Sequence, residues 1–418
     1  MFFSYQILLS FLLTISPLII IIRILRGKED IIRFKEKFCL FSQKKIQGKI
    51  IWFHGSSVGE IMSIIPIVNK LNNDKSVNQI LITSSTLSSS KIIKKYKFKK
   101  VVHQFFPIDH IFFTKIFLNY WRPHVAFFLE SEIWPCMFKE INKKKIPLIL
   151  LNARITKKTF LRWQKLKNFS SYIFGNINIA YPQNQESRRY LKKLGVKKIN
   201  TIGNLKFIDN EKDNFDKKLK SQFKKHKICV AASTHEYEEL FAAKTHILLK
   251  KKFKDLITVL IPRHVHRVSE IKNDLSDLGL RTLNHSENRK NLKNIDIYIV
   301  DTFGESKKFY QLATTVFVGG SIFWRGGHNP LEPARYGAKI LHGPHIKNFT
   351  EIYKMLSLLK ISRRIKTPKQ FANQVTFVKD MKKVSKIKKL GETIFKKTLK
   401  ELNKSINHET KKTQILGL

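Results

Sequence analysis

The sequence is poor in acidic residues, in cysteine and in two short motifs typical of nucleotide sites. Of its 418 residues, 31 are Asp or Glu against 79 Lys or Arg, which gives a formal net charge of +48. No Asp-x-Asp pair occurs, so the usual carboxylate pair for a metal-bound diphosphate is missing, as is a Walker lysine. Cys39, Cys136 and Cys229 lie far apart without metal-ligand spacing. We therefore expect no metal site, and buried free thiols in a reducing compartment.

The positive charge by itself does not select a function. Such a charge would suit a polyanion, either nucleic acid or an anionic membrane surface. The lysines are spread along the whole chain, however, and no basic-aromatic RNA-binding motif stands out. We therefore expect no nucleic-acid partner. A basic binding protein is kept as an alternative, although it leaves the polar strand ends described below unexplained.

An uncharged apolar stretch stands at the start of the chain. Residues 1–22 are mostly Phe, Leu and Ile, and Arg23 and two further basic residues follow at once. That length can span a bilayer, and the basic flank behind it places the main body in the cytoplasm. A signal peptide is disfavoured because no basic region precedes the apolar stretch. We predict a membrane anchor at residues 1–26, either single-pass or peripheral, because Pro17 weakens a straight helix.

After this stretch, candidate strands alternate with helical patterns in two series. The first series of expected strands covers residues 49–54, 79–83, 101–105, 124–129, 147–151, 177–181 and 199–202. The second series covers residues 228–232, 256–261, 295–300, 314–318 and 339–341. Such alternation predicts an α/β protein with parallel sheets covered by helices. A polar, charged run between the series predicts two Rossmann-like domains facing across a cleft.

These patterns divide the chain into five parts. The anchor at residues 1–26 precedes a first Rossmann-like domain at residues 27–208. A linker at residues 209–226 leads to a second Rossmann-like domain at residues 227–400. Residues 401–418 form a C-terminal tail.

One segment of the second half stands out, Phe317-Val-Gly-Gly-Ser-Ile-Phe-Trp-Arg-Gly-Gly-His-Asn-Pro-Leu-Glu-Pro-Ala334. It predicts a buried strand, a glycine loop and a helix capped by Asn329 with Pro330 at its first position. Free N–H groups at that helix end, with Arg325 and His328 nearby, would make an anion site, most plausibly for a nucleotide phosphate. The alternative is a well-capped helix without a ligand.

Polar side chains also follow strands in the first half. Glu60 lies three residues after Ser57, which is capping-box spacing. It either only caps its helix or acts as a general base whose ionised form the helix dipole favours. Glu130 and Glu132 end an apolar strand on one face, so one could be catalytic and the other structural, or both could hold a helix start. Lys206 follows a strand and a glycine at the expected seam between the domains.

Three further junctions lie in the second half. Ala231-Ala-Ser-Thr-His-Glu236 predicts a strand, a hydroxyl cap and a glutamate. Arg263 ends another strand and suits a phosphate oxygen. Thr302 and Glu305 are in capping-box register. Together with the loop at Asn329 they predict a nucleotide pocket, and a metal-free transferase acting on a phosphate leaving group fits the set.

Nine motifs carry a resemblance that covers the chain from about residue 30 to about residue 350. They are His54-Gly-Ser-Ser-Val-Gly-Glu60, Glu130-Ser-Glu-Ile-Trp-Pro135, Asn152-Ala-Arg-Ile155, Gly203-Asn-Leu-Lys-Phe207, Ser233-Thr-His-Glu236, Pro262-Arg-His264, Asp301-Thr-Phe-Gly-Glu305, Gly326-Gly-His-Asn-Pro-Leu-Glu332 and Gly343-Pro-His345. In kind and order this set resembles the 3-deoxy-D-manno-octulosonic acid (Kdo) transferases, which act in lipid A–core assembly of lipopolysaccharide.

The resemblance implies a GT-B fold and inverting transfer of Kdo from CMP-Kdo to the lipid A precursor (lipid IVA). No cofactor or catalytic metal is implied, since CMP-Kdo is a substrate. Residues 27–208 would bind the acceptor and residues 227–400 the CMP-sugar. By position, Glu60 is implied as the proton acceptor, and Glu130 and Lys206 as transition-state stabilisers. The implied CMP-contacting residues are Pro262, Arg263, Phe303, Gly304, Glu305, Asn329, Pro330, Leu331 and Glu332.

The same resemblance implies a location. The apolar anchor and the basic surface suit an acidic, bisphosphorylated lipid at the inner membrane, with the catalytic domains on the cytoplasmic side. The alternative within enzymes is a GT-B protein that uses a UDP-sugar, or a related epimerase. A diphosphate donor would need more cationic contacts than Arg263 and Arg325 provide.

Overall fold

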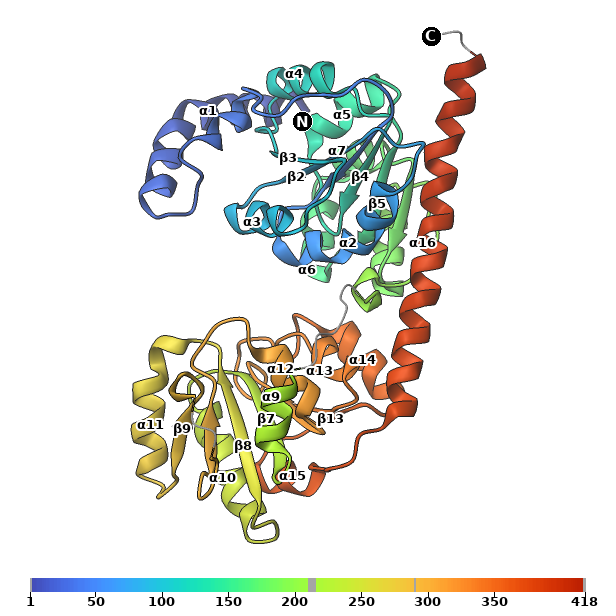
Figure 1. Cartoon of the computed structure of the whole chain (residues 1–418). Coiled ribbons are helices and arrows are strands. Elements are labelled where there is room, and N and C mark those ends of the chain that lie inside the picture. Colours follow the sequence, from blue (N-terminus) through green and yellow to red (C-terminus); the bar gives the residue numbers. More distant parts are fainter. Residues whose placement is uncertain (1, 210–215, 289–290, 416–418) are drawn as a thin grey trace. The chain divides into compact units, whose positions relative to one another are not determined.

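The computed structural model describes residues 2–209, 216–288 and 291–415, which form two compact units (Figure 1). The first unit comprises residues 1–210 together with residues 390–418, and the second comprises residues 211–389. Each unit is built on one parallel sheet, as the alternation of strands and helices predicts.

The first sheet has the strand order β3-β2-β1-β4-β5-β6. Its strands are β1 (Ile50–His54), β2 (Gln79–Ser84), β3 (Val101–Phe105), β4 (Val125–Leu129), β5 (Leu148–Ala153) and β6 (Ile179–Pro182). Strand order reverses between β1 and β4, which pair in parallel, and ligands of such sheets bind at the carboxyl ends beside this reversal. Trp52, Phe127 and Phe128 are fully buried in the two central strands, and burying one such side chain contributes about 1.5–3 kcal/mol.

Helices pack around this sheet. They are α2 (Val58–Asn72), α3 (Leu87–Lys95), α4 (Ile111–Trp121), α5 (Pro135–Lys143), α6 (Lys157–Gln164), α7 (Lys167–Phe174) and α8 (Gln185–Leu194), with the short 3-10 turns η1 (Arg33–Phe38) and η2 (Leu205–Phe207). All five residues of β1 and of β4 are buried, which explains why these strands show continuous apolar runs rather than alternation.

The second sheet has the order β13-β12-β11-β7-β8-β10-β9. Its strands are β7 (Lys227–Thr234), β8 (Leu256–Pro262), β9 (Thr282–Asn284), β10 (Ile297–Ile299), β11 (Thr315–Val318), β12 (Lys339–His342) and β13 (Ser362–Arg364). Its helices are α9 (Lys217–Phe223), α10 (Glu238–Lys250), α11 (Val268–Ser276), α12 (Ser306–Leu312), α13 (Leu331–Arg335), α14 (Thr350–Leu358) and α15 (Pro368–Gln374), with η3 (Val265–Arg267) and η4 (His285–Glu287). Here the order reverses between β7 and β11.

The structure corrects the strand prediction at three places. Residues 199–202 do not form a strand, because Ile199 makes only an isolated bridge to Ala180. The edge strands β9 and β13 were not predicted, since each has only three residues and neither is an apolar run. The polar run at 209–226 contains α9, whose Leu219 and Phe223 are buried. Its residues 210–215 lie outside the described part of the chain.

Two long helices flank the domains in sequence. Helix α1 (Phe2–Leu25) is long and apolar enough to cross a membrane. Helix α16 (Met381–Ile415) is continuous (Figure 1), and its residues from Leu390 onward belong to the first unit. The sequence had placed residues up to 400 in the second domain. The difference arises because α16 packs closely on the first unit, where a Cβ on Gly391 would lie 2.4 Å from the Phe207 carbonyl oxygen.

The three cysteines confirm the thiol prediction. Cys39, Cys136 and Cys229 are buried and free. Burial raises the pKa of the Cys39 and Cys229 thiols to about 12, so they stay protonated and unreactive at neutral pH.

Candidate active site

Glu60 lies where β1 ends beside the strand-order reversal of the first sheet. Ser57 is the N-cap of α2, and its hydroxyl donates to Glu60 Oε1 at 2.8 Å. Glu60 Oε2 accepts the Ser56 backbone N–H at 2.8 Å. The predicted capping box is formed, since Ser57 Oγ accepts the Glu60 N–H at 3.3 Å and Glu60 Oε2 accepts the Ser57 N–H at 3.4 Å. A Cβ at Gly55 would lie 2.8 Å from the Leu129 side chain and 3.2 Å from Glu60 Cβ, so the glycine lets β1 turn sharply against the carboxylate.

The protonation of Glu60 differs from the sequence argument. The helix dipole was expected to favour the ionised form. Instead, burial and then the negative charge of Glu132 raise the pKa of Glu60 to about 7. These effects outweigh the hydrogen bonds from Ser57 and Ser56. Glu60 thus exchanges its proton near neutral pH, which is where a general base works best.

Glu132 is held as a fixed negative charge by a buried hydrogen-bond chain. The indole of Trp52 donates to Thr83 Oγ1 at 2.9 Å, and Thr83 Oγ1 lies 2.9 Å from His54 Nδ1. His54 Nε2 donates in turn to Glu132 Oε2 at 3.2 Å. Complete burial lowers the pKa of His54, so the ring is neutral. Its Nε2 carries the proton, because Nε2 faces the Glu132 carboxylate and Nδ1 faces the Thr83 hydroxyl. The same Glu132 oxygen accepts from Ser56 Oγ at 2.6 Å.

The hydrogen-bond donors around Glu132 determine its pKa. Burial acts to raise the pKa of Glu132, but hydrogen bonds from His54, Ser56 and Trp134 outweigh it and hold the pKa below its usual value. Glu132 therefore stays ionised when Glu60 is protonated. Two carboxyl groups in different environments have their pKa values pushed apart, a pattern typical of acid–base sites.

Glu130 has a different partner from Glu132. Glu130 Oε1 lies 2.6 Å from Lys206 Nζ, within a partly buried ion pair. Asn152 bridges the two segments, since its Nδ2 lies 3.5 Å from Glu130 Oε1 and its Oδ1 accepts the Leu205 N–H at 3.1 Å. The expectation that both glutamates share a strand face is wrong, because β4 ends at Leu129 and Glu130 takes a left-handed φ of 48°.

The run Gly55-Ser-Ser-Val-Gly59 also has the G-x-S-x-G spacing of a serine-hydrolase elbow, which the sequence reasoning missed. The structure argues against a nucleophilic role for Ser57. Its φ of −100° is ordinary extended backbone rather than the strained turn of an elbow, and its hydroxyl is engaged with Glu60. The glycines here serve the capped helix start.

In the second unit, one buried carboxylate organises the glycine loop, and sequence reasoning missed it. Glu238, the first residue of α10, is fully buried. Its Oε2 accepts the N–H groups of Gly320 at 2.6 Å and His235 at 3.1 Å. Its Oε1 accepts those of Ser321 at 3.0 Å and Ile322 at 2.9 Å. The sequence had pointed to Glu236, which is exposed.

Gly319 allows this close approach. A Cβ there would lie 2.5 Å from the Ser233 carbonyl oxygen and 2.7 Å from Glu238 Oε2. The neighbouring Gly320 has a φ of +65°, which other residues adopt at a cost. Gly319 is therefore required because a side chain there would collide with Glu238, and Gly320 is required because of its left-handed backbone conformation.

Histidine and arginine side chains gather beside this loop. His235 Nε2 lies 2.9 Å from His328 Nε2, so one proton is shared between the two rings. Burial and the positive charges around them, including Arg263, lower the pKa of both histidines to about 4. Arg325 contributes to that potential at His235. Among the described residues, Arg263 and Arg325 form no ion pair with a carboxylate. Together with the neutral imidazoles they make a surface that attracts an anion.

The predicted nucleotide residues reach one edge of the second sheet in three groups. Pro262 ends β8 and Arg263 follows it, with the Arg263 N–H bound to the Thr234 carbonyl at the end of β7. The groups around Phe303 and Asn329 follow β10 and β11. Because these strands are parallel, their carboxyl ends share an edge.

Local capping differs from the sequence interpretation. Thr302 and Glu305 form no capping box, since Glu305 itself is the N-cap of α12 and makes no side-chain cap bond. Helix α10 likewise lacks the expected hydroxyl cap, because its N-cap is Tyr237. The predicted cap of the helix after the glycine loop is also wrong by one residue, since Pro330 is the N-cap of α13 and Leu331 its first residue. Asn329 precedes the cap, and its Oδ1 accepts the Leu331 N–H at 3.1 Å. Helix α13 has only five residues, however, so its dipole contributes little.

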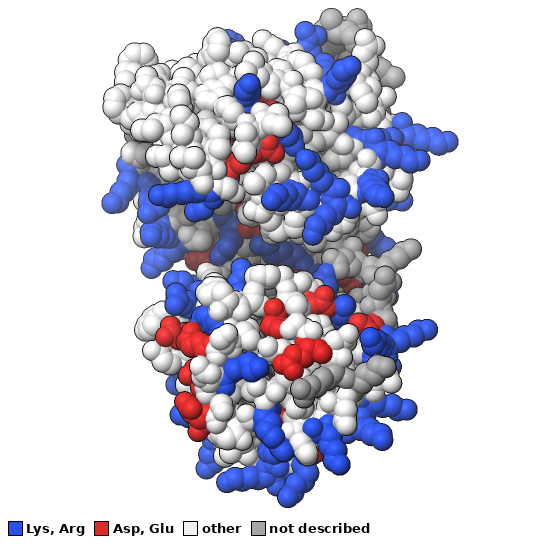
Figure 2. All heavy atoms as spheres, turned by 60° about the vertical axis from the view of Figure 1, so that its left-hand side comes forward, with Lys and Arg blue, Asp and Glu red and all other residues white. Residues whose placement is uncertain are grey.

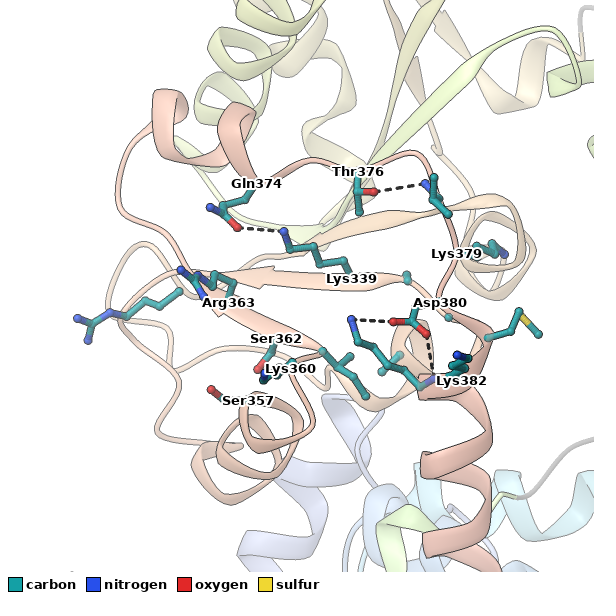
Figure 3. A pocket seen from close by; sticks show the side chains of 18 residues that line it. Lys339, Ser357, Lys360, Ser362, Arg363, Gln374, Thr376, Lys379, Asp380 and Lys382 are labelled. Atoms are coloured by element: carbon teal, nitrogen blue, oxygen red, sulfur yellow. Dashed lines mark hydrogen bonds and ion pairs between the residues drawn. The ribbon is translucent and has the colours of Figure 1, made fainter.

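A cavity of about 920 Å³ lies elsewhere in the second unit (Figure 3). Lys339, Arg363 and Lys379 line it, and Lys339 Nζ donates to Gln374 Oε1 at 2.9 Å. It borders the start of β12, whereas ligands of such sheets bind at the carboxyl ends. None of the residues predicted to contact the nucleotide lines it. Among the described residues, no group of three or more His, Cys, Asp or Glu is placed to hold a metal ion.

Comparisons with known proteins agree on one family. Residues 32–209 match the family model "3-Deoxy-D-manno-octulosonic-acid transferase (kdotransferase)". The 3-deoxy-D-manno-octulosonic acid transferase of Rickettsia bellii is 36% identical over 396 residues, which cover 94% of each chain. The protein of the same name from Haemophilus influenzae is 31% identical and covers 73% of each chain.

A solved structure with a similar fold is the UDP-GlcNAc 2-epimerase of Neisseria meningitidis bound to UDP-GlcNAc. It has a TM-score of 0.56 and 11% identity, and covers 85% of this chain and 100% of that chain. At this identity the likeness concerns the fold alone, and it agrees with a GT-B arrangement of two Rossmann-like sheets.

Proposed function

This chain belongs to the 3-deoxy-D-manno-octulosonic-acid (Kdo) transferase family of glycosyltransferases, and we propose that it transfers Kdo from CMP-Kdo to the lipid A precursor, lipid IVA. The reaction inverts the anomeric centre and uses no metal. The acceptor hydroxyl attacks the anomeric carbon of Kdo while the bond to the CMP phosphate breaks. The acceptor proton passes to Glu60, and CMP leaves with the bonding pair.

One observation carries the proposal: a carboxyl group with a pKa of about 7 stands at the strand-order reversal of the first sheet. A base for a sugar hydroxyl must be deprotonated at working pH and still accept a proton in the transition state. Glu60 meets both conditions because burial, and then the negative charge of Glu132, raise its pKa to about 7. The capping box fixes the direction of the Glu60 carboxylate, which supports a positioned base.

Lys206 and Glu130 form the second element of the proposed site. A cation close to the reacting centre would stabilise the negative charge that develops on the leaving phosphate. The ion pair with Glu130 at 2.6 Å holds the Lys206 ammonium in one place. Asn152 fixes the backbone that carries the lysine through its bond to the Leu205 N–H.

The second unit would hold CMP-Kdo. The Arg263 guanidinium is exposed at the end of β8, next to the loop that Glu238 orders. The His235–His328 pair adds a neutral donor at neutral pH. One guanidinium and backbone N–H groups suit the single phosphate of a CMP-sugar better than the diphosphate of a UDP-sugar.

Transfer from CMP-Kdo to a tetraacyl lipid A precursor tests the assignment, with the donor prepared freshly beforehand and EDTA added only after the donor has been made. We expect product of the mass of the acceptor plus Kdo, at a rate that EDTA does not change. Mass spectrometry of the lipid would read it. The UDP-sugar alternative predicts no such product and turnover of a UDP-sugar instead, and a rate lost with EDTA and restored by Mg²⁺ would contradict metal independence.

Replacing Glu132 is expected to move the pH dependence of the reaction. In the wild type, the acid limb of kcat/KM should fall near pH 7, because Glu60 must be deprotonated. Glu132→Gln removes the negative charge that disfavours ionised Glu60, so the Glu60 pKa falls and the limb moves to lower pH. Burial remains, so the limb should stay above the ordinary carboxyl value of about 4.3.

Trp134→Phe is the matched control for that profile. It removes the indole N–H that binds Glu132 Oε2 at 3.0 Å but keeps the carboxylate charge. Its acid limb should stay close to that of the wild type. An acid limb that does not move in Glu132→Gln, or that moves upward, would contradict the coupling between the two carboxyl groups.

A further inference from the structure

The start of α1 is fixed to the first unit by polar contacts. The Tyr5 hydroxyl donates to Oδ2 of the buried Asp109 at 3.0 Å, and Ser10 Oγ lies 3.2 Å from His110 Nε2. Asp109 also accepts two backbone N–H groups at the start of α5. Pulling α1 away would leave this buried carboxyl group short of one donor, which disfavours detachment.

Aromatic packing holds the same turns. Phe2 and Tyr5 pack against the core cluster of the first unit. The Phe2 ring meets the Tyr172 ring edge-on, with centroids 6.0 Å apart, and Lys139 Nζ lies 4.1 Å from the Phe2 centroid. Residues up to Ser10 are therefore attached to the folded domain.

The other end of α1 returns to the same unit. Arg23 Nε donates to Glu29 Oε2 at 2.9 Å, and Lys37 Nζ binds the same oxygen at 2.7 Å. The Glu29 side chain is fully buried between these two cations. Lys37 belongs to η1, whose Arg33 donates to the His103 carbonyl oxygen in β3 at 2.7 Å. Both ends of α1 are thus attached to the first unit.

A helix tied at both ends to one domain cannot cross a bilayer, because a spanning helix has its ends on opposite sides. Length leads to the same conclusion. After the docked turns, residues 11–25 remain, and at 1.5 Å per residue they extend about 22 Å. The hydrocarbon core of a bilayer is roughly 30 Å thick.

Between its ends, α1 presents an apolar surface that a soluble protein rarely leaves bare. The exposed fraction is 64% for Phe11, 59% for Leu18 and 81% for Leu25. The hydroxyls in this part need no water, since Thr14 donates to the Phe11 carbonyl at 2.7 Å. Figure 2 shows the side that carries α1 as a broad area with few charged side chains.

Basic residues border this surface. Arg26 and Lys28, which follow α1 directly in sequence, are exposed. Ile31 and Ile32, a few residues further on, are exposed as well. Apolar insertion beside exposed cations matches the boundary between acyl chains and anionic headgroups. We propose that α1 lies along one leaflet of an anionic lipid membrane and attaches the chain from one side only, with its N-terminus on the side of the first unit.

A depth measurement tests this attachment. Phe11, Leu18 and Leu25 are spaced by seven residues, so their side chains lie on one face of the helix. Each is replaced by cysteine in turn in the full chain and labelled with an environment-sensitive dye. The labelled proteins are mixed with vesicles containing phosphatidylglycerol, whose lipids carry a quencher at a shallow or a deep acyl position. We expect all three sites to be quenched at the same shallow depth.

A spanning helix gives a different result, since residues 11 and 25 would then differ in depth by about 21 Å. That gradient would overturn the proposal, as would the absence of quenching at all three sites. The three native cysteines are buried and should not take the label. Ser276→Cys, exposed in α11, should label and stay unquenched. If the protein bound equally strongly to vesicles without anionic lipid, the proposed preference for an anionic membrane would be wrong.

Discussion

Glu60→Gln is expected to lower kcat by about 10²–10⁴-fold while leaving the protein as stable as the wild type. General base catalysis by a positioned side chain contributes an acceleration of this size. Glutamine is also a normal third residue of a capping box, so it can still accept the Ser57 N–H that Glu60 accepts. The substitution therefore separates the two roles that the sequence left open for this residue, capping and proton transfer.

Glu60→Ala is the companion variant. It removes the base and the cap together, so its kcat should fall as far as that of Glu60→Gln. Its thermal unfolding should show an additional loss of stability of about 1 kcal/mol from the lost cap. Steady-state rates and melting curves of both variants distinguish a role in proton transfer from a role in capping. Near-normal activity in Glu60→Gln with loss only in Glu60→Ala would mean that Glu60 merely caps α2.

Glu238→Gln is expected to destabilise the second unit and to abolish tight binding of the nucleotide. The carboxylate accepts four backbone N–H groups, from His235, Gly320, Ser321 and Ile322. An amide offers one acceptor oxygen and turns its NH₂ group toward the remaining donors. With about 1–3 kcal/mol for each buried donor left unpaired, two such donors cost roughly 2–6 kcal/mol.

Glu236→Gln is the matched control, because Glu236 lies two residues away and is exposed. It should change neither the melting temperature nor the affinity for CMP in calorimetry. If Glu238→Gln also left both quantities unchanged, the glycine loop would not depend on this carboxylate. A loss of stability with unchanged CMP affinity would place the loop outside the donor site.

The strand pattern was predictable from sequence because the central strands are buried on both faces. The edge strand β3 was also predicted with its observed bounds, 101–105, although it contains the polar His103 and Gln104, because a lysine-rich run precedes it and Pro107 follows it closely. The short edge strands β9 and β13 were missed because polar residues are tolerated at an edge and three residues give no periodicity. Helix bounds were least predictable near α10 and α12, where backbone geometry rather than a side-chain cap starts the helix.

The candidate site was predictable as far as it depends on local spacing. The position of Glu60 beside Ser57 predicted the capping box. Its raised pKa could not be predicted, because it depends on burial and on Glu132, which is distant in sequence. Glu238 was missed for a similar reason. Its four partners lie just after β7 and in the loop after β11, and nothing in the local sequence distinguishes it from Glu236 or Glu239.

Helix α16 has a consequence for the order in which the protein is completed during synthesis. The first unit contains residues 1–210 and residues 390–418, whereas the second is one uninterrupted segment. Ile394, Thr398 and Leu402 of α16 are buried, so the first unit lacks part of its interior until they have left the ribosome. Domains usually finish folding in the order in which they are made. Here the unit that begins first is finished last, and the second unit can fold while the first still awaits its final helix.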